Sequence, residues 1–574
     1  MKSFVRSSSF TDRHATALLL LSYGLLLLAS WQRWTQPLID HGREMNLPAR
    51  LAAGEMLYRD VQFLYGPFAP YFNALLFRVF GLQLSVLHIA GACGGALILL
   101  LLYWLARRLM TGPQAFAAIA LALVTCALKS TGNYVQPYAY AALYGLLFAL
   151  ASLAALVQFT ITQRLRWMMV AGLLAGLSVI AKPELALGAL VAAALLWLTT
   201  SWQTRRIEWR NGLVFALPVI AIAVVTFGVI LSRVSWRVLL EDNHILFTSM
   251  PPQLVYFNRH LSGLARWPQS LWFTLSGVPM LALWCGGCLT FAALWTRERS
   301  TLRKGLLCLS ASALTLFVAF KFFSVPQAVT PFASAVLLLP VLWGRLRTCP
   351  TLALYAVFAF CGILRSFLNV TATGPYTPFF LPLVIVVYLH LLFNLLPQWL
   401  NVNAEVLSHY QRIAVTLIIL LAIGMGVNSI KLLHRQKNFA LQTPRGRLWV
   451  EAEFGQPMAA ALDYVATHTQ PDDEVLCLPM ATTLNFLSAR RQPFFYEILH
   501  PGFLTGAQEA AAIVELERRR VPLILIANLD TSEFRDRTFG QDYQQALMRW
   551  IESRYRVAER FGEGTFFIQA YALR

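Results

Sequence analysis

The sequence predicts a helical membrane protein, with a bundle of about thirteen membrane-spanning helices followed by a small soluble α/β domain. Of its 574 residues, 57% are hydrophobic and only 13% are charged, and the mean hydropathy is +0.57. A soluble domain carries roughly 25% charged residues, so this chain has too little polar surface for one soluble globule. Its apolar residues also form blocks of about 20, the length that crosses a hydrocarbon core as a helix. Continuous apolar blocks favour helices over a closed barrel.

The expected membrane domain covers residues 1–430. Its spans are expected near residues 15–34, 84–105, 114–129, 139–161, 168–181, 183–200, 212–231, 271–295, 305–323, 329–343, 351–368, 378–397 and 413–430. Lys182-Pro183-Glu184 divides one long apolar stretch into two of these spans, because proline breaks a helix. The first apolar run ends in Trp31-Gln32-Arg33-Trp34 without a small-residue cleavage site, so we expect an uncleaved helix rather than a signal peptide.

Basic residues are concentrated in alternate loops. These are Arg107, Arg108, Arg164, Arg166, Arg205, Arg206, Arg210, Arg297, Arg299, Arg303, Lys304, Arg345 and Arg347. The positive-inside rule places these loops and the N-terminus in the cytoplasm. The two longest loops, 35–83 and 232–270, then lie outside with the tail. We therefore expect a multi-pass protein of the cytoplasmic (inner) membrane of the cell envelope, with a periplasmic tail. The loops also account for the net charge of +19, so we expect no nucleic-acid partner.

Residues 431–574 are predicted to form an extracytoplasmic α/β domain. Residues 474–479 and 522–528 are typical of buried strands, and residues 459–468, 506–520 and 542–555 have the periodicity of amphipathic helices. Residues 555–573 predict a hairpin that turns at Gly562-Glu563-Gly564. We find no phosphate-binding loop or dinucleotide fingerprint in this domain. A lid or docking module is therefore favoured over a catalytic domain.

The first outer loop, residues 35–83, gathers seven charged side chains near the membrane surface. They are Asp40, Arg43, Glu44, Arg50, Glu55, Arg59 and Asp60. The spacing from Asp40 to Gly54 predicts an amphipathic surface helix whose Met45, Leu47 and Leu51 face lipid or the bundle. One interpretation is a solvated loop whose charges pair with lipid headgroups. Alternatively, the i, i+3 spacing of Asp40 and Arg43 places a proton acceptor and a phosphate binder on one face.

The same loop resembles the first extracytoplasmic loop of the GT-C glycosyltransferases. These use polyprenyl-phosphate sugars and include protein O-mannosyltransferases and bacterial lipid A aminoarabinose transferases. The matching features are Asp40-x-x-Arg43, Arg50-Leu51 with Gly54, the aromatic-Gly-Pro turn at Tyr65–Pro67, and Phe80-Gly81. Residues 172–187 are similar to the family's helix end, Gly-Leu-Ala-x-Gly-x-x-x-Leu-Thr-Lys-Gly. The order of segments 462–479, 484–496 and 539–555 is similar to the tail of bacterial members.

The resemblance implies an integral membrane glycosyltransferase, a hexosyl- or pentosyltransferase of the cell envelope. It would move a sugar from a polyprenyl-phosphate lipid to an acceptor lipid, glycan or protein by an inverting displacement. Asp40 would be the catalytic base, because a neutral hydroxyl is a weak nucleophile. Arg43, Lys182 and Arg259 would bind the donor phosphate, where charge develops. Many relatives carry a lysine directly before the proline of the turn, where this chain has Gly66. Lys182, or Arg259 with His260, would then take over its contact, or the donor differs.

Other polar residues in the outer loops are candidates for substrate binding. They are Glu44, Asp60, Tyr65, Asn133, Tyr138, His244 and His260. Glu44 is also a candidate structural partner of Arg43, Asp60 of Arg59 or Arg50, and interfacial tyrosines are common in membrane proteins. No cofactor and no metal site are predicted with certainty, although the carboxylates near His244 would suit a divalent cation. A lipid-linked glycan transporter or flippase without transferase activity is the alternative function. The sequence leaves the sugar and the acceptor open.

Overall fold

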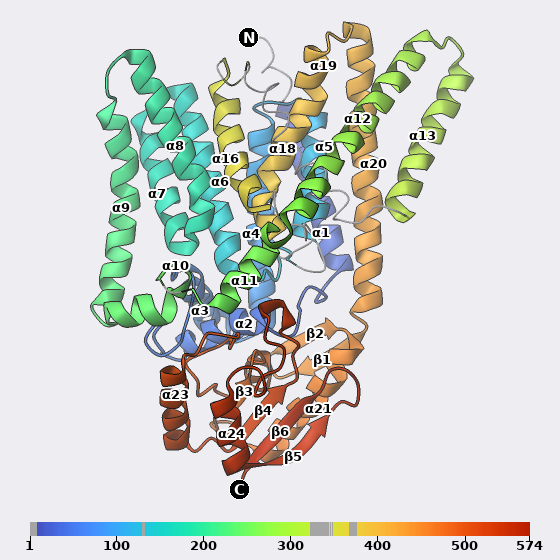
Figure 1. Cartoon of the computed structure of the whole chain (residues 1–574). Helices are drawn as coiled ribbons and strands as arrows, with labels where there is room; N and C mark the ends of the chain where they lie inside the picture. Colours follow the sequence, from blue (N-terminus) through green and yellow to red (C-terminus); the bar gives the residue numbers. More distant parts are fainter. Residues whose placement is uncertain are drawn as a thin grey trace.

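The computed structural model describes residues 9–128, 132–248, 250–321, 344, 346, 348–366 and 376–574. A bundle of long helices forms one layer, an α/β tail forms another, and two short helices lie between them (Figure 1). The bundle helices are α1 Ser9–Ala29, α4 Leu84–Ala106, α5 Gly112–Ala122 with its π-helical extension Leu123–Ala127, α6 Tyr140–Thr162, α7 Leu165–Ala181, α8 Pro183–Thr204, α9 Trp209–Leu231, α12 Trp267–Arg297, α13 Thr301–Lys321, α16 Pro350–Ser366, α17 Thr377–Phe380, α18 Pro382–His390, α19 Leu396–Trp399 and α20 Ala404–Gln436.

The predicted membrane bundle is confirmed, but its helix count is not. Among the described residues, eight helices are long and apolar enough to cross a membrane. Shorter apolar helices, such as α7, occupy further expected spans. The span expected at 329–343, together with Arg345 and Arg347, lies outside the described residues. The predicted count of about thirteen therefore stays a prediction.

The interruption at Lys182 is confirmed as the junction of two helices. α7 ends at Ala181, Lys182 has an extended backbone with φ −156° and ψ 100°, and α8 begins at Pro183. Proline is tolerated at the first helical position because its missing N–H has no intrahelical acceptor there. The junction holds the Lys182 side chain at one end of both helices.

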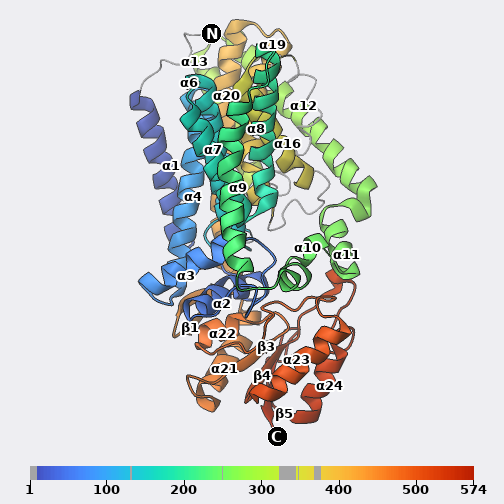
Figure 2. The same ribbon diagram turned by 90° about the vertical axis from the view of Figure 1, so that its left-hand side faces the viewer.

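The two short helices between bundle and tail are α2, Asp40–Ala52, and α3, Phe68–Phe80 (Figure 2). The predicted helix from Asp40 is thus present, but protein surrounds it. Met45, Leu47 and Leu51 are at most 2% exposed. These side chains were expected to face lipid or the bundle. The prediction that they face lipid is wrong, because the tail helix α22, Thr483–Ser488, packs on α2.

The tail is an α/β unit whose central sheet has the order β3-β4-β6-β5. Its strands are β3 Val475–Leu478, β4 Leu523–Ala527, β5 Tyr555–Phe561 and β6 Ile568–Leu573, and its longer helices are α21 Ala452–His468, α23 Gly506–Arg519 and α24 Gln545–Arg554. β3 and β4 are parallel, whereas β6 is antiparallel to β4 and β5. The predicted strands, helices and closing hairpin are confirmed. The sequence interpretation missed the hairpin of β1, Phe439–Thr443, and β2, Gly446–Val450.

A buried ionic contact joins the tail to α2. Arg50 donates hydrogen bonds to the Glu497 carboxylate at 2.7 Å and to the Phe494 carbonyl at 2.8 Å. Asn46 donates to both Glu497 oxygens at 3.0 Å. Both Arg50 and Glu497 are buried. The tail is therefore fixed to the helix that begins with Asp40.

The second long loop, predicted at residues 232–270, also contacts the tail. It contains a π-helical turn, Val238–Asn243, followed by α10 Ile245–Thr248 and α11 Pro252–Leu261. Phe257 of α11 stacks on Phe534 of the tail with ring centroids 4.4 Å apart. Gln253 donates a hydrogen bond to Asp536 at 3.1 Å. α11 and the tail together face α2 across a cavity.

Candidate active site

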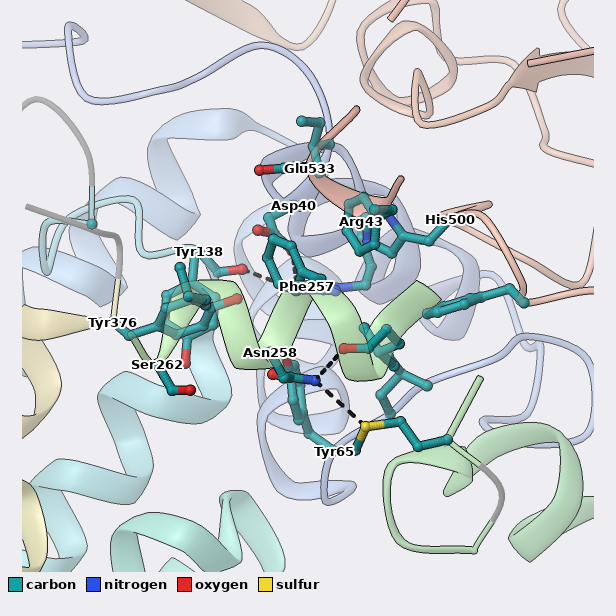
Figure 3. Close-up of a pocket in the computed structure, with 18 of the residues that line it drawn as sticks. Asp40, Arg43, Tyr65, Tyr138, Phe257, Asn258, Ser262, Tyr376, His500 and Glu533 are labelled. Carbon is teal, nitrogen blue, oxygen red and sulfur yellow. Dashed lines mark hydrogen bonds and ion pairs between the residues drawn. The ribbon is translucent and has the colours of Figure 1, made fainter. Parts of the chain in front are cut away.

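A cavity of about 700 Å³ lies where α2, the α7–α8 junction, α11 and the tail meet (Figure 3). Asp40 and Arg43 enter it from α2, Tyr65 from the turn before α3, and Lys182 from the helix junction. Tyr138 precedes α6 and completes this wall. Residues predicted from four separate segments thus share one cavity at the bundle–tail boundary.

Asp40 is the first residue of α2, and the residue before it has an unusual backbone. Ile39 has φ 64° and ψ −121°, a conformation that a β-branched residue rarely adopts. The Ile39 amide donates a hydrogen bond to the Met480 carbonyl of the tail at 2.9 Å. Strained backbone of this kind persists where its surroundings hold it, often at functional sites. Here the tail holds the start of the helix that presents Asp40.

The Asp40 carboxylate faces the cavity and forms an ion pair with Arg43 at 3.1 Å. The Asp40 side chain is 29% exposed. Burial raises the pKa of Asp40 above its ordinary value, and the positive charges of Arg43 and Lys182 offset this only in part. An acceptor for a substrate proton therefore lies beside two cations.

Arg43 is buried and its guanidinium has three partners. Besides Asp40, it donates to Glu44 at 3.0 Å and to the Tyr138 carbonyl at 3.0 Å. The second Glu44 oxygen accepts a hydrogen bond from the Tyr140 amide at 2.8 Å. Glu44 does not line the cavity. It orients Arg43, while Arg43 itself reaches the cavity wall.

Lys182 is 2% exposed and lies among aromatic and acidic groups. Its ammonium donates to the Tyr138 hydroxyl at 2.8 Å and pairs with Glu184 at 3.2 Å. It also lies 3.7 Å from the centre of the Tyr65 ring, within the range of a cation–π contact. The side chain is thus held in the cavity wall rather than extended toward lipid headgroups.

Gly66 lies in close backbone contact with the end of α7. A Cβ atom built on Gly66 would lie 2.0 Å from the Ile180 carbonyl oxygen. No side chain fits there without moving α7 or the turn. Lys182 follows Ile180 by two residues and places its ammonium over the ring of Tyr65, the residue before Gly66. A cation is therefore present at this turn, supplied by a different segment.

Besides Glu44, four predicted residues lie outside the cavity lining. Asp60 pairs with Arg59 at 2.7 Å, and Asn133 is buried and bonded to backbone groups. The His244 ring nitrogen contacts the Leu239 carbonyl, and His260 stacks on Tyr256. Arg259 lines the cavity with an exposed side chain.

Several cavity residues were not found from the sequence. Asn258 comes from α11, Tyr376 from the segment before α17, and His500, Phe503 and Glu533 from the tail. No motif surrounds these residues, so only their position in the fold identifies them. Their presence means that the tail forms part of the cavity wall.

The described residues contain no group of three or more His, Cys, Asp or Glu side chains arranged to hold a metal ion. Cys285 and Cys288 have a C-x-x-C spacing, but both are free and buried within α12.

Comparisons with known proteins identify a related family and a similar fold. Residues 65–230 match the family model described as dolichyl-phosphate-mannose-protein mannosyltransferase. The structure is similar to the crystal structure of ArnT from Cupriavidus metallidurans in the apo state, with a TM-score of 0.54, 14% identity, and coverage of 97% of this chain and 98% of that chain. For the same protein bound to undecaprenyl phosphate, the TM-score is 0.52, the identity 14%, and the coverage 96% and 97%. A comparison with curated protein sequences finds no match. At this identity, the structural likeness establishes the fold.

Proposed function

We propose that this chain transfers a sugar from a polyprenyl phosphate to an acceptor hydroxyl by inverting displacement. Its mannosyltransferase-family segment and its fold support a membrane glycosyltransferase of the GT-C type. The observation that carries the proposal is the shared cavity of Asp40, Arg43 and Lys182. A base for the acceptor and cations for the leaving phosphate are the two requirements of this reaction.

Asp40 would accept the proton of the acceptor hydroxyl as the oxygen attacks the anomeric carbon. The bond from that carbon to the phosphate oxygen breaks in the same step, and the polyprenyl phosphate leaves with both bonding electrons. Arg43 and Lys182 would stabilise the charge that develops on the phosphate. Because Glu44 and Tyr138 hold these two cations in place, little reorganisation is needed during the reaction.

An apolar groove beside the cavity supports the use of a polyprenyl donor. The groove measures about 490 Å³ and is lined by residues of α3, α7 and α9. Pro67 and Ile180 line the groove, while their near neighbours Tyr65 and Lys182 line the cavity. A lipid chain in the groove would therefore have its phosphate next to Lys182. In ArnT, the fold accommodates undecaprenyl phosphate.

The polar groups of the cavity also favour a transferase over a transporter. A transporter is expected to bind its substrate near the membrane midplane, between broken helices. Here Asp40, Arg43 and Tyr65 come from the connection between two spans, and the tail closes the site. We infer that this connection and the tail lie outside the cytoplasm, at the inner membrane, as the loop charges indicate.

The test is Asp40→Asn in the purified full-length protein, reconstituted in lipid nanodiscs with radiolabelled undecaprenyl-phosphate hexoses and pentoses. Loss of the base should lower release of undecaprenyl phosphate by about 10²–10⁴-fold while donor binding persists. Asp60→Asn is the matched control, because Asp60 lies outside the cavity and pairs with Arg59. If Asp40→Asn turns over at the wild-type rate, Asp40 is not the base. If the wild type is inactive with every donor, the proposed transferase function is contradicted.

A further inference from the structure

A carboxylate from the tail faces the cavity without a partner. Glu533 lies in the 3₁₀ turn Ser532–Phe534 and lines the cavity together with Asp40. Its carboxylate makes no hydrogen bond or ion pair with any residue that the structure describes. Figure 3 shows Glu533 on the far side of Asp40 from Tyr138, whose hydroxyl accepts the Lys182 hydrogen bond.

The backbone that presents Glu533 is firmly held. Phe534 is 1% exposed and stacks between Phe257 of α11 and His500 of the tail, at centroid distances of 4.4 and 4.5 Å. The Thr531 hydroxyl donates to the Asp536 carbonyl at 2.7 Å and closes the turn. The Glu533 side chain is exposed, but it extends into the cavity lining from a backbone position that is well packed.

The charged groups of the cavity come from different elements. Lys182 lies on the bundle side, paired with Glu184 and next to Tyr65 and Tyr138, Asp40 and Arg43 lie on α2, and Glu533 lies under the tail. The donor phosphate belongs on the bundle side, because its lipid chain must remain in the membrane. In a single displacement, the nucleophile approaches the anomeric carbon from the side opposite the leaving phosphate. The acceptor then enters the region that Glu533 faces.

We propose that Glu533 binds the acceptor, accepting a hydrogen bond from a hydroxyl next to the one that reacts, and that it excludes acceptors with a negative charge at that end. The expected acceptor is therefore a polyhydroxyl compound that is neutral or cationic, such as a sugar ring without an acidic substituent. This inference rests on the proposed transferase function, which assigns the bundle side of the cavity to the donor.

The electrostatics of the two carboxylates support this assignment. Partial burial raises the pKa of Glu533, and the negative charges of Asp40 and Asp530 raise it further. Two carboxylates that face one cavity repel each other unless hydrogen-bond donors lie between them. An acceptor hydroxyl donating to Glu533 and a reacting hydroxyl donating to Asp40 would supply such donors. An anionic acceptor would add a further negative charge beside these two.

The experiment compares three acceptors with the same ring and different charge: methyl glucoside, methyl glucuronide and methyl glucosaminide. The wild-type protein in nanodiscs receives the radiolabelled donor and each glycoside, and kcat/KM for transfer is measured for each. Because bringing like charges together is strongly unfavourable, wild type should prefer the glucoside over the glucuronide by about tenfold or more. Glu533→Gln should reduce that ratio to about threefold or less.

Glu563→Gln is the matched control, because Glu563 is an exposed carboxylate in the β5–β6 turn of the same domain. It should keep the wild-type ratio. Binding of the three glycosides to donor-free protein, measured by saturation-transfer NMR, gives a second readout that needs no turnover and should show the same change in Glu533→Gln.

A wild-type charge preference that persists in Glu533→Gln, in transfer or in binding, would overturn the assignment of Glu533. Absence of transfer by the wild type to water or to any glycoside would count against the transferase instead. In that case the binding ratios would still decide whether Glu533 selects ligands by charge.

Discussion

At the scale of single residues, the site depends on a backbone contact as much as on its charges. Gly66 meets the Ile180 carbonyl so closely that a Cβ atom would lie 2.0 Å from the oxygen. This contact brings the end of α7 to the aromatic turn and places the Lys182 ammonium 3.7 Å from the Tyr65 ring centre. Glycine at position 66 thus allows Lys182 to reach the aromatic turn.

Gly66→Ala is therefore expected to destabilise the protein by about 1–3 kcal/mol, since an added methyl group in a packed site forces backbone shifts. The apparent Tm of the purified variant, compared with wild type in the same detergent, measures the effect. Gly228→Ala is the control, because nothing lies within 4 Å of a Cβ built there and alanine favours a helix. Equal Tm values for the two variants would show that the Gly66 contact is not tight.

At the scale of elements, hydropathy determines what can be predicted from sequence. α6 was expected at 139–161 and occupies Tyr140–Thr162, and the α7–α8 junction falls at the predicted Lys182-Pro183. Apolar length and proline are local signals, so they locate helix boundaries well. The β1–β2 hairpin was missed because its short strands lack regular alternation. Asp40 and Arg43 were identified from a motif, whereas Glu533 was not, because its approach to Asp40 depends on how the tail packs.

The groove between α3, α7 and α9 gives a prediction at this scale. Val229 of α9 lines the groove, so Val229→Trp should fill it and raise the KM for a long polyprenyl-phosphate donor. The same substitution should leave the KM for a short citronellyl-phosphate donor nearly unchanged, because that chain needs less of the groove. Val224→Trp is the matched control: Val224 is 64% exposed on the same helix and does not line the groove. Equal KM values for both donors in Val229→Trp would place the lipid chain elsewhere.

At the scale of the whole molecule, the tail and the bundle form one site. The tail supplies Glu533 and His500 to the cavity and holds Ile39, the residue before Asp40, through the Met480 carbonyl. Arg50, near the other end of α2, is bound to Glu497 of the tail. Both ends of α2 are thus fixed by the tail, which makes the position of Asp40 depend on a domain that carries no catalytic motif.

Glu497→Ala tests this dependence. It removes one of the two carboxylates that pair with the buried Arg50 guanidinium at 2.7 Å and leaves the other, Glu55, in place. The cost should therefore be about 2–3 kcal/mol, below the roughly 3–5 kcal/mol of a buried pair that is broken completely. Glu474→Ala removes a more exposed pair with Arg519 from the same domain and should cost less than about 1 kcal/mol. Chemical unfolding of both variants measures the stability difference, and donor turnover measured where both remain folded shows whether Asp40 has moved. We expect Glu497→Ala to lose turnover without losing donor binding, because the base is displaced while the phosphate contacts of Lys182 remain. If Glu497→Ala is as stable and as active as Glu474→Ala, the tail does not position α2.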